Sequence, residues 1–123
     1  MENVSIALAA TVSFLAFAAH VSIGTKQNAA PILDDASLPD GPRRTLAFSW
    51  QANSVLLLFM TFGFAAAFYF QSVPLLAFNA TLAAVLGGLA LLVSVRSSVN
   101  PLKFPPAPLF LAIAAFGIYG WAS

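Results

Sequence analysis

The sequence predicts an all-α polytopic membrane protein, a single domain over residues 1–123 with four transmembrane helices in an up-down bundle. Three observations support this fold class. Hydrophobic residues make up 60% of the chain and charged residues only 7%, a composition far from that of a soluble domain. The apolar residues fall into four long runs, each close to the ~20 residues that cross a bilayer. The lysines and arginines lie only in the connections between these runs.

The first predicted helix covers residues 3–23. One of its faces gathers small and polar side chains at steps of four and three, namely Ser5, Ala9, Ser13, Ala16 and His20. Such a face is typical of close packing between membrane helices. The chain begins Met-Glu-Asn without a positive charge, and its apolar run continues to Ile23, so we expect a helix rather than a cleaved signal peptide.

The predicted second helix, residues 45–70, is the longest apolar run and follows a polar segment, residues 24–44. We expect this segment to be a cytoplasmic loop, because Pro31, Pro39 and Pro42 interrupt helical hydrogen bonding. The connection after the second helix, Gln71-Ser72-Val73, is very short. It therefore predicts that the second and third helices are antiparallel neighbours.

The third helix is predicted over residues 74–95 and the fourth over residues 105–122, with a second cytoplasmic loop at 96–104. Small residues of the first, third and fourth helices are expected to form packing seams. Pro105, Pro106 and Pro108 fit the first turn of the fourth helix, whose amides lack partners within the helix. This helix is the shortest of the four.

The distribution of positive charge predicts the orientation. The two predicted loops carry all five basic residues, Lys26, Arg43, Arg44, Arg96 and Lys103, and the opposite side carries none. Because cytoplasmic loops are enriched in Lys and Arg, we expect a multi-pass protein of the bacterial inner membrane with both termini in the periplasm. These five residues are interpreted as topology determinants and contacts to lipid headgroups.

Polar side chains cluster near the loop-side ends of the first two helices. His20 lies at the end of the first, and Trp50, Gln51 and Asn53 lie in the first turns of the second. An unsatisfied polar group in lipid costs several kcal/mol, so we expect these side chains to face protein or water. Two interpretations stay open. Either they form a cytoplasm-facing pocket in which His20 titrates or coordinates a ligand, or they bind one another or loop backbone and fix the bundle.

Asn79, in the outer third of the third helix, completes the candidate polar residues. We expect it to hydrogen-bond a neighbouring helix, or alternatively to line a permeation path. No metal or haem is expected, because one His, no Cys and no Asp or Glu within a predicted helix cannot form such a site. No enzymatic pair of nucleophile and base can be assembled either. Contact with a bound lipid, or with a pigment held by a partner, is the one cofactor role left open.

Residues 15–60 also show a family resemblance. His20-Val-Ser-Ile-Gly24 and the segment from Arg44 to Trp50 resemble uncharacterised four-span bacterial inner-membrane proteins of similar length, in which an arginine and a Trp-His pair open the second helix. Gln51 stands where the second His would be, which argues against a paired-histidine role. The resemblance implies the fold but no activity.

Together these observations predict a non-enzymatic accessory or structural subunit of a larger membrane complex, for example a respiratory or photosynthetic one. The alternative is a small oligomeric transporter or channel in which the candidate polar residues line the path. The expected partners are membrane lipids and either other subunits or further copies of this chain. Nucleic acid is not expected, because a net charge of +1 provides no basic surface.

Overall fold

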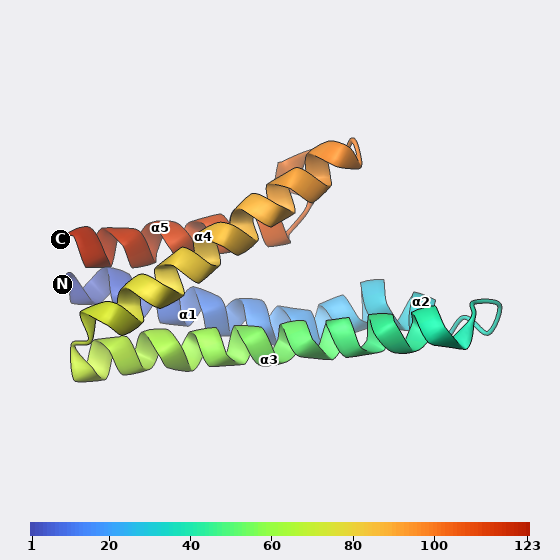
Figure 1. Ribbon diagram of the computed structural model, residues 1–123, viewed down its shortest axis with the longest axis horizontal. Coiled ribbons are helices and arrows are strands. Elements are labelled where there is room, and N and C mark those ends of the chain that lie inside the picture. The colour runs from blue at the N-terminus through green and yellow to red at the C-terminus, as the bar shows by residue number, and fades with distance from the viewer.

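A computed structural model describes the whole chain, residues 1–123, and every regular element in it is helical (Figure 1). The elements are, in order, α1 (Asn3–Ala19), the π-helix η1 (His20–Ala29), α2 (Ala30–Leu33), α3 (Asp40–Phe70), α4 (Val73–Arg96), the 3₁₀ turn η2 (Pro101–Lys103) and α5 (Pro106–Ala122). Three continuous helical stretches, Asn3–Leu33, Asp40–Phe70 and Val73–Arg96, are long and apolar enough to cross a membrane, and α5 is a shorter apolar helix. The all-α fold class is confirmed.

The helices form two antiparallel hairpins that are joined at one end and apart at the other (Figure 1). One hairpin consists of α1, η1 and α2 against α3, and the other of α4 against α5. Both termini lie at the joined end, here called the termini end, where the Glu2 amide donates to the Gly120 carbonyl (2.9 Å). Toward the opposite end, here called the loop end, the α4–α5 hairpin diverges from the α1–α3 hairpin (Figure 1).

The packed core holds the joined part of the bundle together. Its largest fully buried apolar side chains come from all four long helices: Ile6, Met60, Phe64, Leu76 and Ile113. The predicted small-residue face of α1 is buried from Ser5 to Ala16, and α4 and α5 bury Ala80, Ala83, Ala114 and Gly117. Small residues of α1, α4 and α5 are therefore packed inside the chain.

The prediction of a loop over residues 24–44 is wrong at both ends, because helix occupies residues 24–33 and 40–44. Pro31 lies in the first turn of α2, directly after the π-helix, so the helical stretch continues through a residue that lacks an amide hydrogen. Pro42 is likewise within the first turn of α3, whose amides have no intrahelical acceptors. The true loop is residues 34–39, and α3 has 31 residues.

The other two connections follow the sequence closely. Gln71 adopts a left-handed conformation (φ 50°) at the end of α3, and the Ser72 hydroxyl accepts the Leu75 amide (3.4 Å) at the start of α4. The chain thus reverses over two residues, which confirms that α3 and α4 are antiparallel neighbours. Residues 97–105 connect α4 to α5 and include only the short turn η2.

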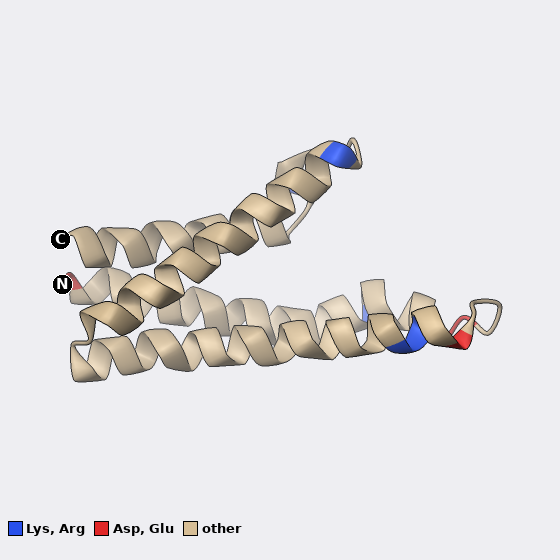
Figure 2. Cartoon of the chain, viewed as in Figure 1, with Lys and Arg blue, Asp and Glu red and all other residues tan.

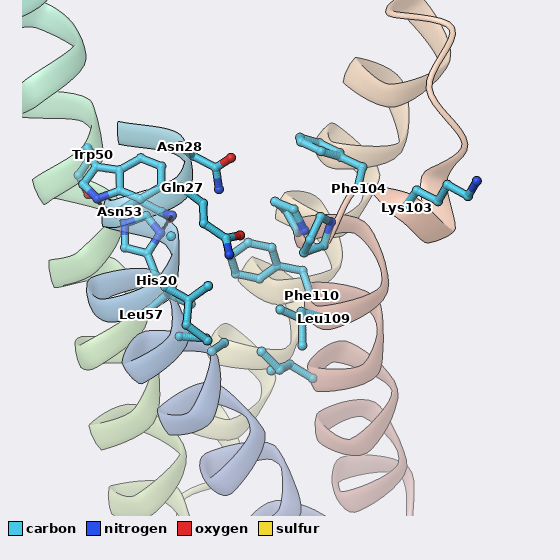
Figure 3. A pocket seen from close by; sticks show the side chains of 17 residues that line it. His20, Gln27, Asn28, Trp50, Asn53, Leu57, Lys103, Phe104, Leu109 and Phe110 are labelled. Carbon is cyan, nitrogen blue, oxygen red and sulfur yellow. Dashed lines mark hydrogen bonds between the residues drawn. The ribbon is translucent and has the colours of Figure 1, made fainter. Parts of the chain in front are cut away.

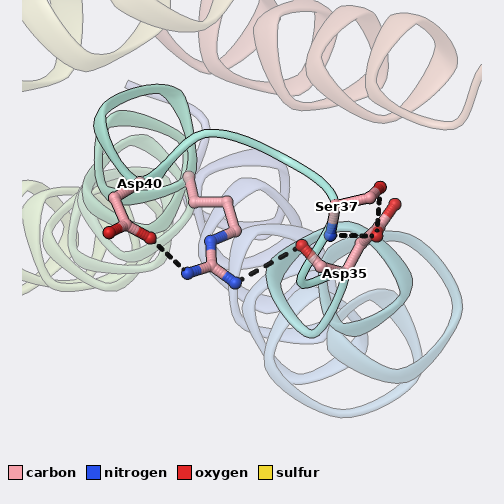
Figure 4. A network of polar contacts seen from close by, with 4 residues as sticks. Asp35, Ser37 and Asp40 are labelled. Carbon is pink, nitrogen blue, oxygen red and sulfur yellow. Dashed lines mark hydrogen bonds and ion pairs between the residues drawn. The ribbon is translucent and has the colours of Figure 1, made fainter.

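Charged side chains lie mainly at the loop end (Figure 2). Arg43 pairs with Asp40 (2.6 Å) and donates to the Asp35 carbonyl (3.3 Å), and the Asp35 carboxylate accepts the Ser37 hydroxyl (2.6 Å) and amide (2.9 Å) (Figure 4). The Ser37 hydroxyl, then its amide and the Arg43 charge, lower the pKa of Asp35 below its ordinary value. At the other end, hydrogen bonds from Ser5 lower the pKa of Glu2, which caps α1.

Candidate functional site

A cavity of about 610 Å³ lies between the two hairpins at the loop end (Figure 3). One wall comes from the end of α1, from η1 and from α3, and the other from η2, α5 and the residues between them. The polar side chains that line it are His20, Gln27, Asn28, Trp50, Asn53 and Lys103. The principal apolar ones are Ile23, Leu57, Phe104, Leu109, Phe110 and Ile113. The volume is in the range of small-molecule sites in proteins.

His20 is held against Trp50 of α3 by two contacts. Its Nε2 lies 3.0 Å from the Trp50 backbone carbonyl, and the imidazole stacks on the indole with ring centroids 4.0 Å apart and planes inclined by 22°. A carbonyl oxygen can only accept, so His20 Nε2 carries a hydrogen in this arrangement. The contact joins the first turn of η1 to α3.

Asn53 engages the second imidazole nitrogen. Its Nδ2 lies 3.4 Å from His20 Nδ1, which accepts this hydrogen bond when Nε2 is the protonated nitrogen. Both nitrogens of the only histidine are thus occupied by protein groups, and no cluster of three metal-ligating side chains forms anywhere in the chain. As arranged, His20 positions the wall of the cavity and leaves no nitrogen for a metal.

The π-helix supplies the other partner of Trp50. Thr25 Oγ1 accepts the indole N–H (3.1 Å) and donates to the His20 carbonyl five residues earlier (3.2 Å), a separation that matches the wider π turn. Gly24 makes room for the indole, because a Cβ there would lie 3.2 Å from Trp50 Cζ2. Through His20, Gly24 and Thr25, the π-helix therefore packs against the Trp50 indole and binds its N–H.

The structure brings together three of the residues that the sequence singled out and separates two others. His20, Trp50 and Asn53 all line the cavity. Gln51 is exposed and does not line it, because neighbouring residues of a helix point about 100° apart. The expected place of Gln51 in the polar cluster is therefore wrong.

Asn79 lies between α3 and α4, outside the cavity. Its Nδ2 donates to the Leu75 carbonyl of its own helix (2.8 Å), so the expected hydrogen bond to a neighbouring helix is not formed. It is only 4% exposed, and its amide packs where Gly63 of α3 has no side chain. A shallow apolar hollow between Phe59, Phe62, Phe78 and neighbouring residues borders it.

Sequence reasoning missed Gln27, Asn28, Phe104 and Phe110, which line the cavity, and Thr25, which binds the Trp50 indole. Thr25, Gln27 and Asn28 fell within the segment expected to be a loop, and Phe104 and Phe110 were not distinguished from other apolar residues. A helix continued past Gly24 would have placed His20, Gly24 and Gln27 at steps of four and three on one face. The basic residues of the loop end are not brought together, and only Lys103 borders the cavity.

In comparisons with known proteins, no family model, no curated protein and no solved structure matches this chain. Its function is therefore inferred from the geometry of the cavity and of the bundle.

Proposed function

We propose that the protein is a small non-enzymatic transporter of the bacterial inner membrane, with four spans, that takes its substrate into the cavity from the cytoplasmic side. The loop end faces the cytoplasm in this proposal, because it carries all the lysines and arginines. α5, with 17 residues, is at the short end of the range for a membrane span. Oligomerisation would supply further walls, since four helices enclose little volume.

The observation that carries this proposal is the one-sided opening of the bundle. The cavity is open between the hairpins at the loop end, while Ile6, Phe64 and Leu76 are completely buried toward the termini end. Leu57 and Ile113, at the boundary, line the cavity and also belong to the core. A binding site that is open to one side and sealed from the other is what alternating access requires of a carrier.

Thiol labelling tests the transporter proposal without knowledge of the substrate. The chain has no cysteine, so an introduced thiol is the only one and the parent protein is the blank. We expect a membrane-impermeant maleimide to label Leu109→Cys, in the cavity, from the loop side. We expect it to label Ala9→Cys, fully buried in the closed half, slowly from the termini side as that half opens.

A complete lack of reaction at Ala9→Cys, with Leu109→Cys reactive, would contradict transport and leave a static cavity. Solute flux into liposomes provides the second readout. We expect Asn53→Leu to abolish solute flux. Gln51 is exposed and lies outside the cavity, so we expect Gln51→Leu to leave the flux unchanged.

An accessory subunit of a larger complex is the second candidate. It is supported by α4 of the diverging hairpin, where Val85, Leu89 and Val95 are 62%, 54% and 68% exposed. A partner helix could cover these side chains, although the small-residue seams are already used within the chain. Extraction in mild detergent, with a native gel and mass spectrometry, separates the two: stable co-migration with other subunits would favour the accessory role.

A further inference from the structure

The floor of the cavity is apolar, and its polar side chains lie on one wall and toward the mouth. Its floor is formed by Ala16, Leu57 and Ile113, toward the packed core. Its mouth carries Gln27 and Asn28 of the π-helix, and Figure 3 shows the Gln27 amide directed into the space. A molecule that fills it would therefore keep its polar end toward the mouth and its apolar end toward the floor.

The lining also discriminates by charge. No Asp or Glu borders the cavity, and the ammonium group of Lys103, the one charged lining side chain, points away from it (Figure 3). A charged group transferred from water into this space would have no counter-ion within it. Burial of an unpaired charge is much more costly than burial of a hydrogen-bonded neutral group. The lining therefore favours an uncharged molecule over a cation or an anion.

The walls offer neutral hydrogen-bonding groups and a broad apolar surface. Asn53 uses Nδ2 for His20, so its Oδ1 is available to a donor, and the Gln27 amide provides both a donor and an acceptor. Opposite them lie Phe104, Leu109 and Phe110. A carbonyl or hydroxyl head would suit the amides, and a ring or a short chain would suit the aromatic wall.

We propose that the cavity binds an uncharged amphiphile whose carbonyl or hydroxyl head lies between Gln27 and Asn53 and whose apolar body lies against Phe110 and Leu57. This assignment rests on the proposed transport function in that it names the class of substrate. Two membrane sources share the chemistry: a quinone-type ring with an apolar tail, and a glyceride with a neutral head.

Trp50 provides the measurement, because it lines the cavity. In a Trp121→Phe background it is the only tryptophan of the chain. The protein in lipid nanodiscs is titrated with four probes of equal tail length: a decyl benzoquinone, decanoylglycerol, decanoate and decyltrimethylammonium. We expect a saturable change in Trp50 fluorescence with at least one neutral probe, and weaker binding of decanoate and of the cation. A response to the quinone alone identifies the ligand as a quinone-type ring, and a response to the glyceride alone identifies it as a neutral glyceride.

Matched variants locate the binding. Gln27→Leu removes an exposed amide that supports no other side chain, so the fold is retained, and we expect the affinity for the neutral probe to fall about tenfold for one lost hydrogen bond. Asn53→Leu should weaken binding at least as much, and Gln51→Leu should leave it unchanged.

Several results would overturn the assignment: no saturable change with either neutral probe, a charged probe that binds as tightly, or full affinity in Gln27→Leu. The labelling of Ala9→Cys tests the transport proposal separately from the fluorescence titration, which tests the ligand class. Neutral binding without that labelling would retain the ligand class and reject transport. Labelling without neutral binding would retain transport and reject the ligand class.

Discussion

Gly117 lies where three helices meet, and its missing side chain is required there. A Cβ at this position would come within 2.9 Å of Ala80 Cβ on α4 and 3.0 Å of Phe64 Cε1 on α3. Both neighbours are buried and cannot withdraw, so we expect Gly117→Ala to destabilise the protein by about 1–3 kcal/mol, as overpacked cores do. The measurement is the free energy of unfolding in detergent.

Gly88→Ala is the matched control for Gly117→Ala. Gly88 lies in the interior of α4, and an added Cβ there would have no heavy atom within 4 Å apart from its chain neighbours and the nearby backbone of its own helix. Alanine favours a helix over glycine by about 1 kcal/mol. We expect Gly88→Ala to be neutral or stabilising. If both substitutions lowered the free energy of unfolding equally, the close contacts at Gly117 would not be the cause of the loss.

Single residues were predictable where a polar group must find a partner within an apolar run. This holds for His20, Trp50 and Asn53, which contact one another through both imidazole nitrogens, the Trp50 carbonyl and the Asn53 Nδ2, while the Trp50 indole N–H binds Thr25. It failed for Gln51, because closeness in sequence does not give a shared helix face. It also failed for Asn79, whose amide found an acceptor in its own helix.

At the scale of an element, the turn between α2 and α3 depends on Asp35. Its folded pKa is lowered, so the charged form stabilises the turn above the ordinary aspartate pKa of about 3.9, and this contribution is lost as the pH falls through the lower folded value. We expect Asp35→Asn to speed amide hydrogen exchange in residues 34–39 at pH 7, relative to the parent.

The difference between parent and Asp35→Asn should disappear in acid, where the parent carboxyl is also neutral. Asp34→Asn, which changes an exposed neighbour that forms no side-chain hydrogen bond, is the control and should exchange like the parent at both pH values. An Asp35→Asn effect that persists unchanged in acid would mean that the carboxylate charge is not its cause.

The main error in predicting elements was to treat Pro31 and Pro42 as breaks. Proline removes an amide hydrogen, which costs no intrahelical hydrogen bond at Pro42, in the first turn of α3, and is tolerated at Pro31, where the π-helix passes into α2. Near these boundaries α2 and η1 pack against each other and against α3. The apolar period identified the four long helices, but not this π-helix.

At the scale of the whole molecule, the two ends of the bundle are predicted to face opposite sides of the membrane. We expect an impermeant maleimide applied outside intact cells to label Ser123→Cys, and to label Ala36→Cys, in the exposed loop between α2 and α3, only after permeabilisation. The opposite pattern would reverse the orientation. Labelling of both from outside would contradict the predicted spanning arrangement.

The divergence of the hairpins gives the molecule unequal cross-sections, narrow at the termini end and broad at the loop end (Figure 1). In a bilayer such a shape acts as a wedge, since it displaces more lipid from one leaflet than from the other. The protein would then insert at the lowest free-energy cost where membrane curvature expands the leaflet that holds the broad loop end. Because closing the cavity would narrow that end, lateral pressure in this leaflet would itself favour the closed form.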